Sequence, residues 1–262
     1  MQNMPERDSY SPGTPCWVEL GSSDLDAGVP FYEGLFGWNV AESMPDTGGY
    51  RLAMLRDRPV AGLSPLMSDQ QPVAWTTYVS TDAADGVAEK VKANGGQVVA
   101  EPMDVMELGR MTVFLDPQGA ALGAWQPIQF PGAGIVNEPG AFTWNELLTR
   151  DIGAAHAFYP AALGWTADEQ DFLGMKYTLW KVGDDMVAGG MPMGDEFPAE
   201  VPSYWAVYFA VDDTDATAQR ATELGGTVMR PPSDIPDVGR FAVLVDPQGA
   251  VFAVIKNAQP AA

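Results

Sequence analysis

Apolar and polar residues alternate along several short stretches of this chain, as they do in strands that have one buried face. The first such stretch covers residues 16–21 and another covers residues 74–80, and both contain Trp and Val. Shorter stretches at residues 50–56, 59–63 and 97–100 have the same character. We therefore expect many short strands, whose side chains alternate between a core and an open face.

A different spacing follows the first of these strands. Apolar side chains recur every three or four positions, and Asp24 or Asp26 can cap a helix that ends at Gly37. Proline removes a backbone N–H and clashes with the preceding turn of a helix. We therefore expect Pro30 to be compatible with this helix only if the helix starts late.

A second helix is predicted from an N-cap at Asp82 to a stop at Gly95. It is followed by a hairpin whose strands cover residues 111–115 and 121–126. The turn between them is Asp-Pro-Gln-Gly, in which Pro presets φ at the second position and Gly relieves the fourth.

The entire pattern occurs twice. Adding 127 to a residue number in the first half gives an equivalent residue in the second half, and the offset becomes 130 after a three-residue insertion. The recurring residues include Trp17 and Trp144, Glu19 and Glu146, Tyr50 and Tyr177, Gly62 and Gly189, Tyr78 and Tyr208, Arg110 and Arg240, and the segments Asp116–Ala120 and Asp246–Ala250. A period this long is unlike that of a solenoid, whose units span roughly 20–50 residues. The chain is therefore a duplicated domain.

We predict a first domain over residues 12–127, a linker over residues 128–139 that is rich in Pro and Gly, and a second domain over residues 140–258. The length of 262 residues is consistent with two domains.

The composition restricts the partners. The chain has 14 Lys and Arg residues against 35 Asp and Glu residues, a formal net charge of −21. Such a charge repels phosphate backbones and anionic lipids, so we expect neither nucleic acid nor a membrane as a partner. It would attract a cationic ligand, or it simply keeps the surface soluble. The single cysteine, Cys16, fits a small buried side chain in a reducing compartment, and residues 1–8 lack the apolar core of a signal peptide. We therefore expect a cytoplasmic protein.

In this order and in duplicate, the motifs resemble the vicinal-oxygen-chelate superfamily, also called the glyoxalase, bleomycin-resistance and extradiol-dioxygenase group. The resemblance rests on a strand followed by Asp-Leu, Phe-Tyr and Gly-Trp, and on the Asp-Pro-Gln-Gly hairpin. It covers nearly the whole chain and is strongest to the tandem two-domain actinobacterial type. It implies an α+β fold of tandem glyoxalase-like domains, each with two βαβββ units that form a curved mixed sheet around a cup, with the helices outside. A tandem chain can be a monomer with an internal pseudo-twofold axis or can form a homodimer.

Metal-dependent members of this superfamily hold a divalent ion with His and Glu side chains from four strand positions. Here those positions fall on Trp17 and Trp144, Thr76 and Ala206, Gly123 and Ala253, and the strands at 59–67 and 187–193, none of which offers His, Asp or Glu. The one histidine, His156, lies on a predicted helix, where a surface or packing role fits better than a ligand role. Because catalytic metal sites usually need three protein ligands, we expect no metal and no other cofactor in either cup.

Alternation along the strands predicts what the cups contain instead. The candidate catalytic residues are Glu19 and Glu146, and the candidate ligand-binding residues are Trp17, Tyr78, Arg110, Trp125, Trp144, Tyr208 and Arg240. Each glutamate is either a general acid or base whose pKa is raised by burial, or a structural group held by Arg110 or Arg240 or by backbone donors. The tyrosines could bind a ligand carbonyl or simply satisfy their hydroxyl groups within the cup, and the indoles could stack on a ligand or only pack.

The spacing does not assign two further sets of residues to the cup or to the core. Tyr50 and Tyr177 recur but cannot be assigned to a face of the sheet. Flexible methionine side chains could form deformable cup walls or belong to the core, and the candidates are Met103, Met106, Met111, Met175, Met191 and Met193.

The first hypothesis for the function is metal-independent binding or sequestration of a small apolar, aromatic or cationic molecule, as in drug-binding members of the superfamily. The alternative is an enzyme of secondary metabolism that tailors a polyketide-like substrate with Glu19 or Glu146 as acid or base. A metal-dependent lyase or dioxygenase is the third and least favoured hypothesis, because the ligand positions do not fit it. The sequence does not decide whether the protein is an enzyme.

Overall fold

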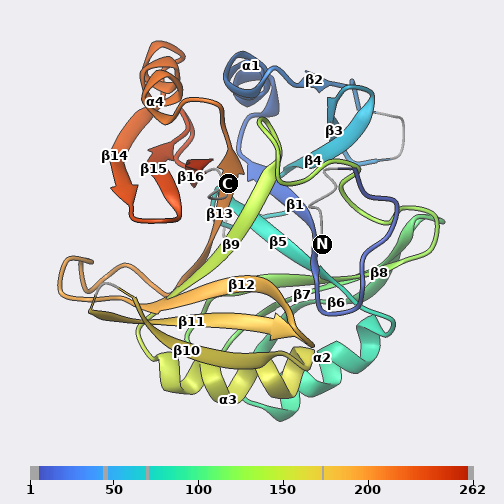
Figure 1. The fold of residues 1–262 in the computed structure, drawn as a ribbon. Coiled ribbons are helices and arrows are strands. Elements are labelled where there is room, and N and C mark those ends of the chain that lie inside the picture. The colour runs from blue at the N-terminus through green and yellow to red at the C-terminus, as the bar shows by residue number, and fades with distance from the viewer. Residues whose placement is uncertain (1–5, 44–46, 69–70, 173, 259–262) are drawn as a thin grey trace.

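Strands and helices follow the same order in both copies of the repeat. The computed structural model describes residues 6–43, 47–68, 71–172 and 174–258 (Figure 1). Residues 1–5, on which part of the signal-peptide expectation rests, lie outside this set. The elements of the first copy are β1 (Pro15–Ser22), α1 (Leu25–Phe36), β2 (Asn39–Val40), β3 (Arg51–Leu55), β4 (Arg58–Pro65), β5 (Ala74–Ser80), α2 (Ala84–Ala93), β6 (Gln97–Val105), β7 (Gly109–Leu115) and β8 (Ala121–Pro127). Those of the second copy are β9 (Phe142–Thr149), α3 (Ile152–Leu163), β10 (Thr166–Phe172), β11 (Met175–Val182), β12 (Asp185–Pro192), β13 (Tyr204–Ala210), α4 (Thr214–Glu223), β14 (Thr227–Ile235), β15 (Gly239–Val245) and β16 (Val251–Asn257).

Each copy forms one eight-stranded mixed sheet from two βαβββ units. The strand order is β2-β3-β4-β1-β5-β8-β7-β6 in the first copy (sheet 1) and β10-β11-β12-β9-β13-β16-β15-β14 in the second (sheet 2). The first strands of the two units, β1 and β5, pair antiparallel at the middle of sheet 1, and β1 pairs with β4 in parallel. This arrangement confirms the predicted α+β fold of tandem glyoxalase-like domains, with helices outside the curved sheets (Figure 1). We retain 12–127, 128–139 and 140–258 as the proposed limits of the domains and linker.

Helix α1 has the aspartate cap that the sequence predicted. Asp24 accepts a hydrogen bond from a backbone N–H of the first turn (3.1 Å), and Gly37 ends the helix with a φ of 70°, a conformation that favours glycine. The expectation that Pro30 requires a late start was wrong, because α1 begins directly after Asp24 and contains Pro30. Pro30 and Asp26, whose carbonyl lacks its usual partner, are both exposed, so water can supply the missing hydrogen bond.

The predicted N-cap of the second helix was wrong by one residue. Helix α2 begins at Ala84, and its cap residue is Ala83 rather than Asp82, with no side-chain cap bond. The equivalent of Ala83 in the second copy is Asp213, which accepts a hydrogen bond from the N–H of Ala216 (3.0 Å) and caps α4. The cap position is therefore the same in both copies, but only the second copy carries a capping side chain there.

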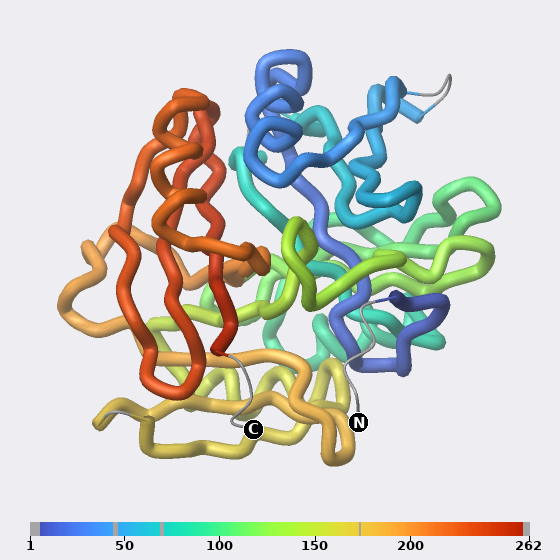
Figure 2. Tube along the Cα trace, turned by 45° about the horizontal axis from the view of Figure 1, so that its top comes forward, coloured from blue at the N-terminus to red at the C-terminus, as the bar shows by residue number. Residues whose placement is uncertain are grey.

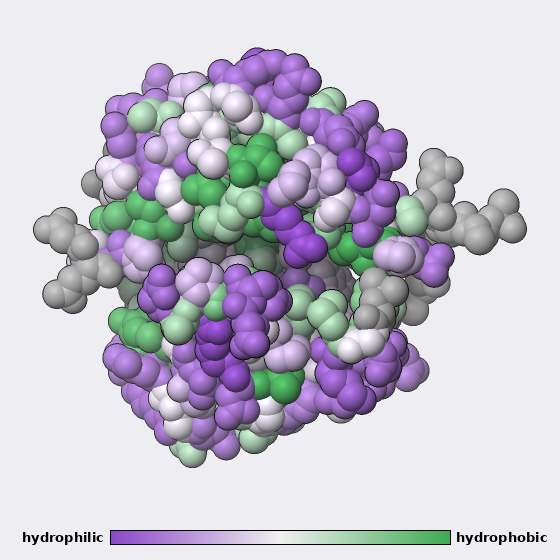
Figure 3. Space-filling model, turned by 90° about the vertical axis from the view of Figure 1, so that its left-hand side faces the viewer, coloured by the Kyte–Doolittle hydropathy of each residue, from purple (hydrophilic) through white to green (hydrophobic). Residues whose placement is uncertain are grey.

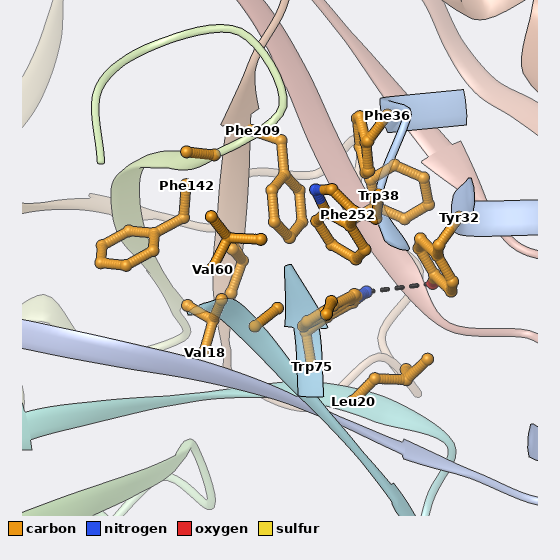
Figure 4. Packing of buried hydrophobic residues seen from close by; sticks show 14 of the residues in the cluster. Val18, Leu20, Tyr32, Phe36, Trp38, Val60, Trp75, Phe142, Phe209 and Phe252 are labelled. Atoms are coloured by element: carbon orange, nitrogen blue, oxygen red, sulfur yellow. Dashed lines mark hydrogen bonds between the residues drawn. The ribbon is translucent and has the colours of Figure 1, made fainter. Parts of the chain in front are cut away.

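The first helix of each copy packs against the sheet of the other copy. Phe36 of α1 lies 4.9 Å from Phe209 of β13 between ring centroids (Figure 4). Phe158 of α3 lies 6.2 Å from Phe114 of β7. Helix α1 consequently lies beside α4, and α3 lies beside α2 (Figures 1 and 2). Each copy thus completes the hydrophobic core of the other.

Two buried aspartates link the copies. Tyr32 of α1 donates a hydrogen bond to Asp246 (2.9 Å), and Tyr159 of α3 donates one to Asp116 (2.8 Å). The other oxygen of each carboxylate accepts two backbone N–H groups of its own Asp-Pro-Gln-Gly turn. The Phe-Tyr motif of each copy therefore contacts the Asp-Pro-Gln-Gly motif of the other copy.

The two sheets meet at the centre of the molecule. Thr77 of β5 donates a hydrogen bond to Asn145 of β9 (2.6 Å), and both side chains are buried. Cys16 is also buried, with its sulfur 3.4 Å from the backbone carbonyl oxygen of Tyr78. The prediction that Cys16 is a small buried side chain is confirmed.

Candidate ligand-binding cups

Each sheet curves around a cup that is lined mainly by apolar side chains. The cavity formed by both cups has a volume of about 2390 Å³, whereas a typical small-molecule pocket has roughly 300–1,000 Å³. Figure 3 views the molecule from the side of β10–β12 and β14, where it is hollowed between two lobes and apolar residues gather along the hollow. The cups therefore have room for a ligand with several fused rings.

Alternation along the central strands directs the predicted side chains into the cups. Trp17, Glu19 and Tyr78 line the first cup, and Glu146 and Tyr208 line the second. The intervening residues of β1 and β5 point into the core, where Trp75 is buried and donates a hydrogen bond to Tyr32 of α1 (Figure 4). These five candidate site residues, and Trp125 as a sixth, therefore line the cups as the sequence predicted.

Glu146 is the polar centre of the second cup. Its carboxylate accepts hydrogen bonds from the hydroxyl groups of Tyr177 (2.8 Å) and Tyr208 (2.7 Å). Tyr177 in turn accepts a hydrogen bond from the indole N–H of Trp144 (3.1 Å). Strands β9, β11 and β13 supply these four side chains. Both oxygens of the carboxylate are consequently held by phenols.

The first cup repeats this network with small differences. The indole N–H of Trp17 donates to the hydroxyl of Tyr50 (3.0 Å), and Tyr50 and Tyr78 both hydrogen-bond Glu19. Ser64 also donates to Glu19 (3.3 Å). Whereas Glu146 is only 7% exposed, Glu19 is half-buried and is more open to the cup.

Burial changes the proton affinity of these groups. It raises the pKa of Glu19 and of Glu146 above the ordinary value of 4.5, and hydrogen bonds from the tyrosines oppose the rise. Burial, together with the nearby carboxylates, also raises the pKa of Tyr78 and Tyr208 well above 10.0. The phenols therefore remain neutral donors, and the carboxyl groups are the ones that can exchange a proton.

The two recurring arginines are not part of either cup. Arg110 forms ion pairs with Asp85 of α2 (2.7 Å) and Asp104 (2.8 Å), and Arg240 forms the equivalent pairs with two aspartates. Their prediction as ligand-binding residues was wrong, as was the alternative in which they hold the glutamates. Along β7 the neighbouring Met111 and Val113 line the cavity, so alternation turns Arg110 toward the helix.

Tyr50 and Tyr177 are site residues that the sequence could not place. A signal for them was present in Gly62 and Gly189, which recur with them. A Cβ added at either glycine would lie 1.9 Å from the hydroxyl oxygen of the nearby tyrosine. These glycines leave the space that each phenol needs in order to reach its glutamate.

The remaining predicted tryptophans differ in role. Trp125 lines the first cup, and its indole N–H donates to the backbone carbonyl of Phe130 (2.7 Å) in the linker. Phe130 also packs edge-on against Trp17 with centroids 5.0 Å apart, so the linker closes part of the first cup. Trp144 is not one of the cavity-lining residues. It packs beneath the second cup, against the cluster that contains Tyr208 and Phe241.

Methionines form a substantial part of the cup walls. Five of the six predicted ones, Met103, Met106, Met111, Met175 and Met191, line the cavity, and Met193 instead is buried outside the lining. The methionine side chain is flexible and unbranched, so it can adjust to ligands of different shapes.

Comparison with known proteins places this geometry in a family. Residues 16–123 match the family described as the Glyoxalase/Bleomycin resistance protein/Dioxygenase superfamily, and residues 144–255 match a glyoxalase-like domain. The protein named "Putative glyoxylase CFP32" of Mycobacterium tuberculosis is 45% identical over 263 aligned positions, which cover 97% of this chain and 99% of that protein. The chain belongs to the glyoxalase/bleomycin resistance/dioxygenase superfamily.

Other members of the superfamily are similar in sequence or only in fold. The anthracycline biosynthesis protein DnrV of Streptomyces peucetius is 42% identical, with 94% of each chain covered. The Mn(II)-bound glyoxalase of Novosphingobium aromaticivorans shares 17% identity at a TM-score of 0.65, with 95% of this chain and 83% of that chain covered. A dioxygenase from Sphingomonas wittichii shares 15% identity at a TM-score of 0.64, with 95% and 92% covered. The last two show a common fold.

The residues of the cups do not fit the divalent metal that such superfamily members hold. The central carboxylate of each cup, Glu19 or Glu146, is already bonded to phenols. In the described part of the chain, no group of three or more His, Cys, Asp or Glu side chains could hold a metal ion. His156 lies on α3, where its Nε2 is 2.8 Å from the hydroxyl of Thr178 and its ring packs against Trp180. The packing role expected for His156 is confirmed.

No helix within the described ranges is long and apolar enough to cross a membrane.

Proposed function

We propose that this protein binds flat, largely apolar small molecules in its aromatic cups without a metal ion. The observation that carries this proposal is the closed Trp-Tyr-Glu-Tyr network in each cup. Both oxygens of Glu146 accept hydrogen bonds from phenols, at 2.7 and 2.8 Å, and no group of three or more His, Cys, Asp or Glu side chains among the described residues could hold a metal ion. The aromatic wall and the methionines remain as the binding surface.

The relatives support this class of ligand. DnrV and DauV are named anthracycline biosynthesis proteins, and they match 94% and 97% of this chain. Anthracyclines have fused planar rings, which suit stacking on indole and phenol faces. We therefore propose that the ligand is an aromatic, polyketide-like compound. We further propose that the protein acts in the cytoplasm, as a monomer or a homodimer.

The second candidate is an enzyme that moves a proton on such a compound. The observation in its favour is the pKa of Glu19, which burial raises, in a side chain that is only partly buried and lines the cup. A carboxyl group whose pKa lies nearer to neutrality is a better acid–base catalyst. Glu146 has the same shift but is more enclosed.

One experiment separates the two functions. Hydroxymethyl anthraquinone serves as a neutral flat ligand in calorimetry, and benzoylacetone, a flat diketone with an acidic C–H, serves as a proton-transfer substrate whose deuterium exchange is followed by NMR. For a binding protein, E19Q and E146Q should change the affinity for the anthraquinone by less than about tenfold, and wild-type protein should not accelerate exchange. The exposed Glu200→Gln provides the control variant.

Acceleration of exchange by wild-type protein that is lost in E19Q would favour the enzyme. Stoichiometric Zn, Mn, Ni or Fe in the purified protein would contradict the metal-independent assignment. Absence of anthraquinone binding would contradict the proposed ligand class.

A further inference from the structure

The two cups differ at a position that carries a positive charge in only one of them. Arg230 of β14 lines the second cup, and its counterpart in the first cup is Ala100. The guanidinium carbon of Arg230 lies 4.8 Å from the centroid of the Phe241 ring, whose counterpart in the first cup is Met111. The register of both hairpins agrees with this assignment, because Arg230 pairs with Val243 as Ala100 pairs with Val113.

The guanidinium of Arg230 has no carboxylate of its own. Among the described residues, none lies within ion-pair distance of it, whereas Arg110 and Arg240 are each paired with two aspartates. Glu146 is near enough for the positive charge of Arg230 to lower its pKa, but its oxygens are bonded to Tyr177 and Tyr208. The exposed guanidinium of Arg230 therefore has no ion-pair partner among the described residues, in a wall made mainly of apolar side chains.

The contact with Phe241 also determines which part of the guanidinium group is free to bind a ligand. Phe241 is buried and supports one face of the guanidinium plane, and its ring centroid is 6.5 Å from that of Tyr208. The N–H groups at the edge of the plane remain as donors, in the forked arrangement that matches a carboxylate or another oxygen anion. A flat ligand lying against Tyr208, whose ring is next to that of Phe241, would bring a substituent on its rim to Arg230.

We propose that the second cup selects aromatic anions, meaning flat ring systems that carry a carboxylate, phenolate or enolate, and that Arg230 is its specificity-determining residue. The first cup, with Ala100 and Met111 at these places, takes neutral rings. The inference rests on the proposed binding function and assigns a ligand class to one of its two sites. The positive charge of Arg230 is opposite in sign to the net charge of −21, which repels anions from the rest of the surface.

Calorimetric titration with a matched pair of ligands tests the assignment. Anthraquinone carboxylate and hydroxymethyl anthraquinone, substituted at the same ring position, differ chiefly in charge. R230Q should weaken binding of the carboxylate by about 10- to 100-fold, the loss typical of a hydrogen-bonded charge, and should change binding of the alcohol by less than about twofold. R230K keeps the charge but loses the planar fork, so its affinity for the carboxylate should be intermediate.

Arg220→Gln is the control, because it removes the same charge from an exposed arginine of α4 that is paired with Glu223. It should leave both affinities unchanged. Equal effects of R230Q on the two ligands, or no effect on either, would overturn the assignment and leave the proposed function standing. Binding of only the alcohol by wild-type protein would also overturn the assignment and leave the proposed function standing. If wild-type protein binds neither ligand, the proposed function fails and this inference fails with it.

Discussion

Glu19 and Glu146 are ionisable groups in places where water solvates a charge poorly. Each is compensated mainly by phenol hydroxyl groups, and indole N–H groups orient one phenol of each pair. Hydrogen bonds from neutral donors stabilise a buried carboxylate only in part, so the neutral acid is favoured relative to water. The protonation of each carboxyl group therefore makes both the stability of the fold and the chemistry of the cup depend on pH.

The pH dependence of stability follows from this shift. In the folded protein the pKa of each glutamate lies above 4.5, whereas in the unfolded chain it is near that value. The stability contributed by the protonated carboxyl groups is therefore complete below the unfolded pKa and is lost as the pH rises through the folded pKa. We expect the double variant E19Q/E146Q, which stays neutral, to gain stability relative to wild type on going from about pH 5 to about pH 8.

Urea unfolding of both proteins at the two pH values measures this difference, because effects of all other charges cancel in the comparison. The exposed Glu200→Gln variant should show no such trend. A difference between wild type and the double variant that does not change with pH would show that the glutamates are not shifted.

At the scale of elements, the two copies use the same backbone with unequal side chains. Asp24, Asp151 and Asp213 each cap a helix by accepting a backbone N–H of the first turn. Ala83 adopts a similar extended conformation before α2, with φ −152°, but has no side-chain acceptor. Helix α2 is therefore the one helix of the described structure that lacks a side-chain cap.

A cap introduced at this place should stabilise the protein. We expect Ala83→Asp to raise the free energy of unfolding by about 0.5–1 kcal/mol, since the residue is exposed and its backbone is already suited to capping. Removing the equivalent cap with Asp213→Ala should lower it by about 1 kcal/mol. Chemical denaturation measures both. Destabilisation by Ala83→Asp would show that the first turn of α2 does not accept the side chain.

At the scale of the whole molecule, the copies depend on each other for their cores. Helix α1 packs on β13 and β16 of sheet 2, and the contacts of Tyr32 with Asp246 and of Tyr159 with Asp116 connect the copies in both directions. We infer that the two copies unfold together, although the repeat suggests two separate domains.

Scanning calorimetry tests this cooperativity. Tyr32→Phe and Tyr159→Phe each leave a buried aspartate oxygen without its partner, which costs roughly 1–3 kcal/mol. We expect wild type to show a single transition and each variant to shift that whole transition to lower temperature. Two separable transitions, with each variant moving only one, would show that the copies are stable independently.

The sequence by itself determined the properties that depend on local periodicity and on the repeat. Strand alternation placed Trp17, Glu19 and Tyr78 in the first cup, because side chains on a strand point to opposite faces in turn. Duplication with a fixed offset identified the two copies and the shared motifs. The resemblance then supplied the α+β fold, which the sheet topology confirms.

Only the tertiary structure decided which residues meet across the sheets and between the copies. Tyr50 directly precedes β3 and Tyr177 lies within β11, and spacing does not show which face of the sheet either residue is on. They reach the glutamates only because Gly62 and Gly189 are adjacent in space. Arg110 was assigned to the cup although its charge is neutralised by Asp85, which lies 25 residues away in sequence. Contacts of this kind depend on strand order and on the packing of helices, and periodicity along one segment does not encode either of them.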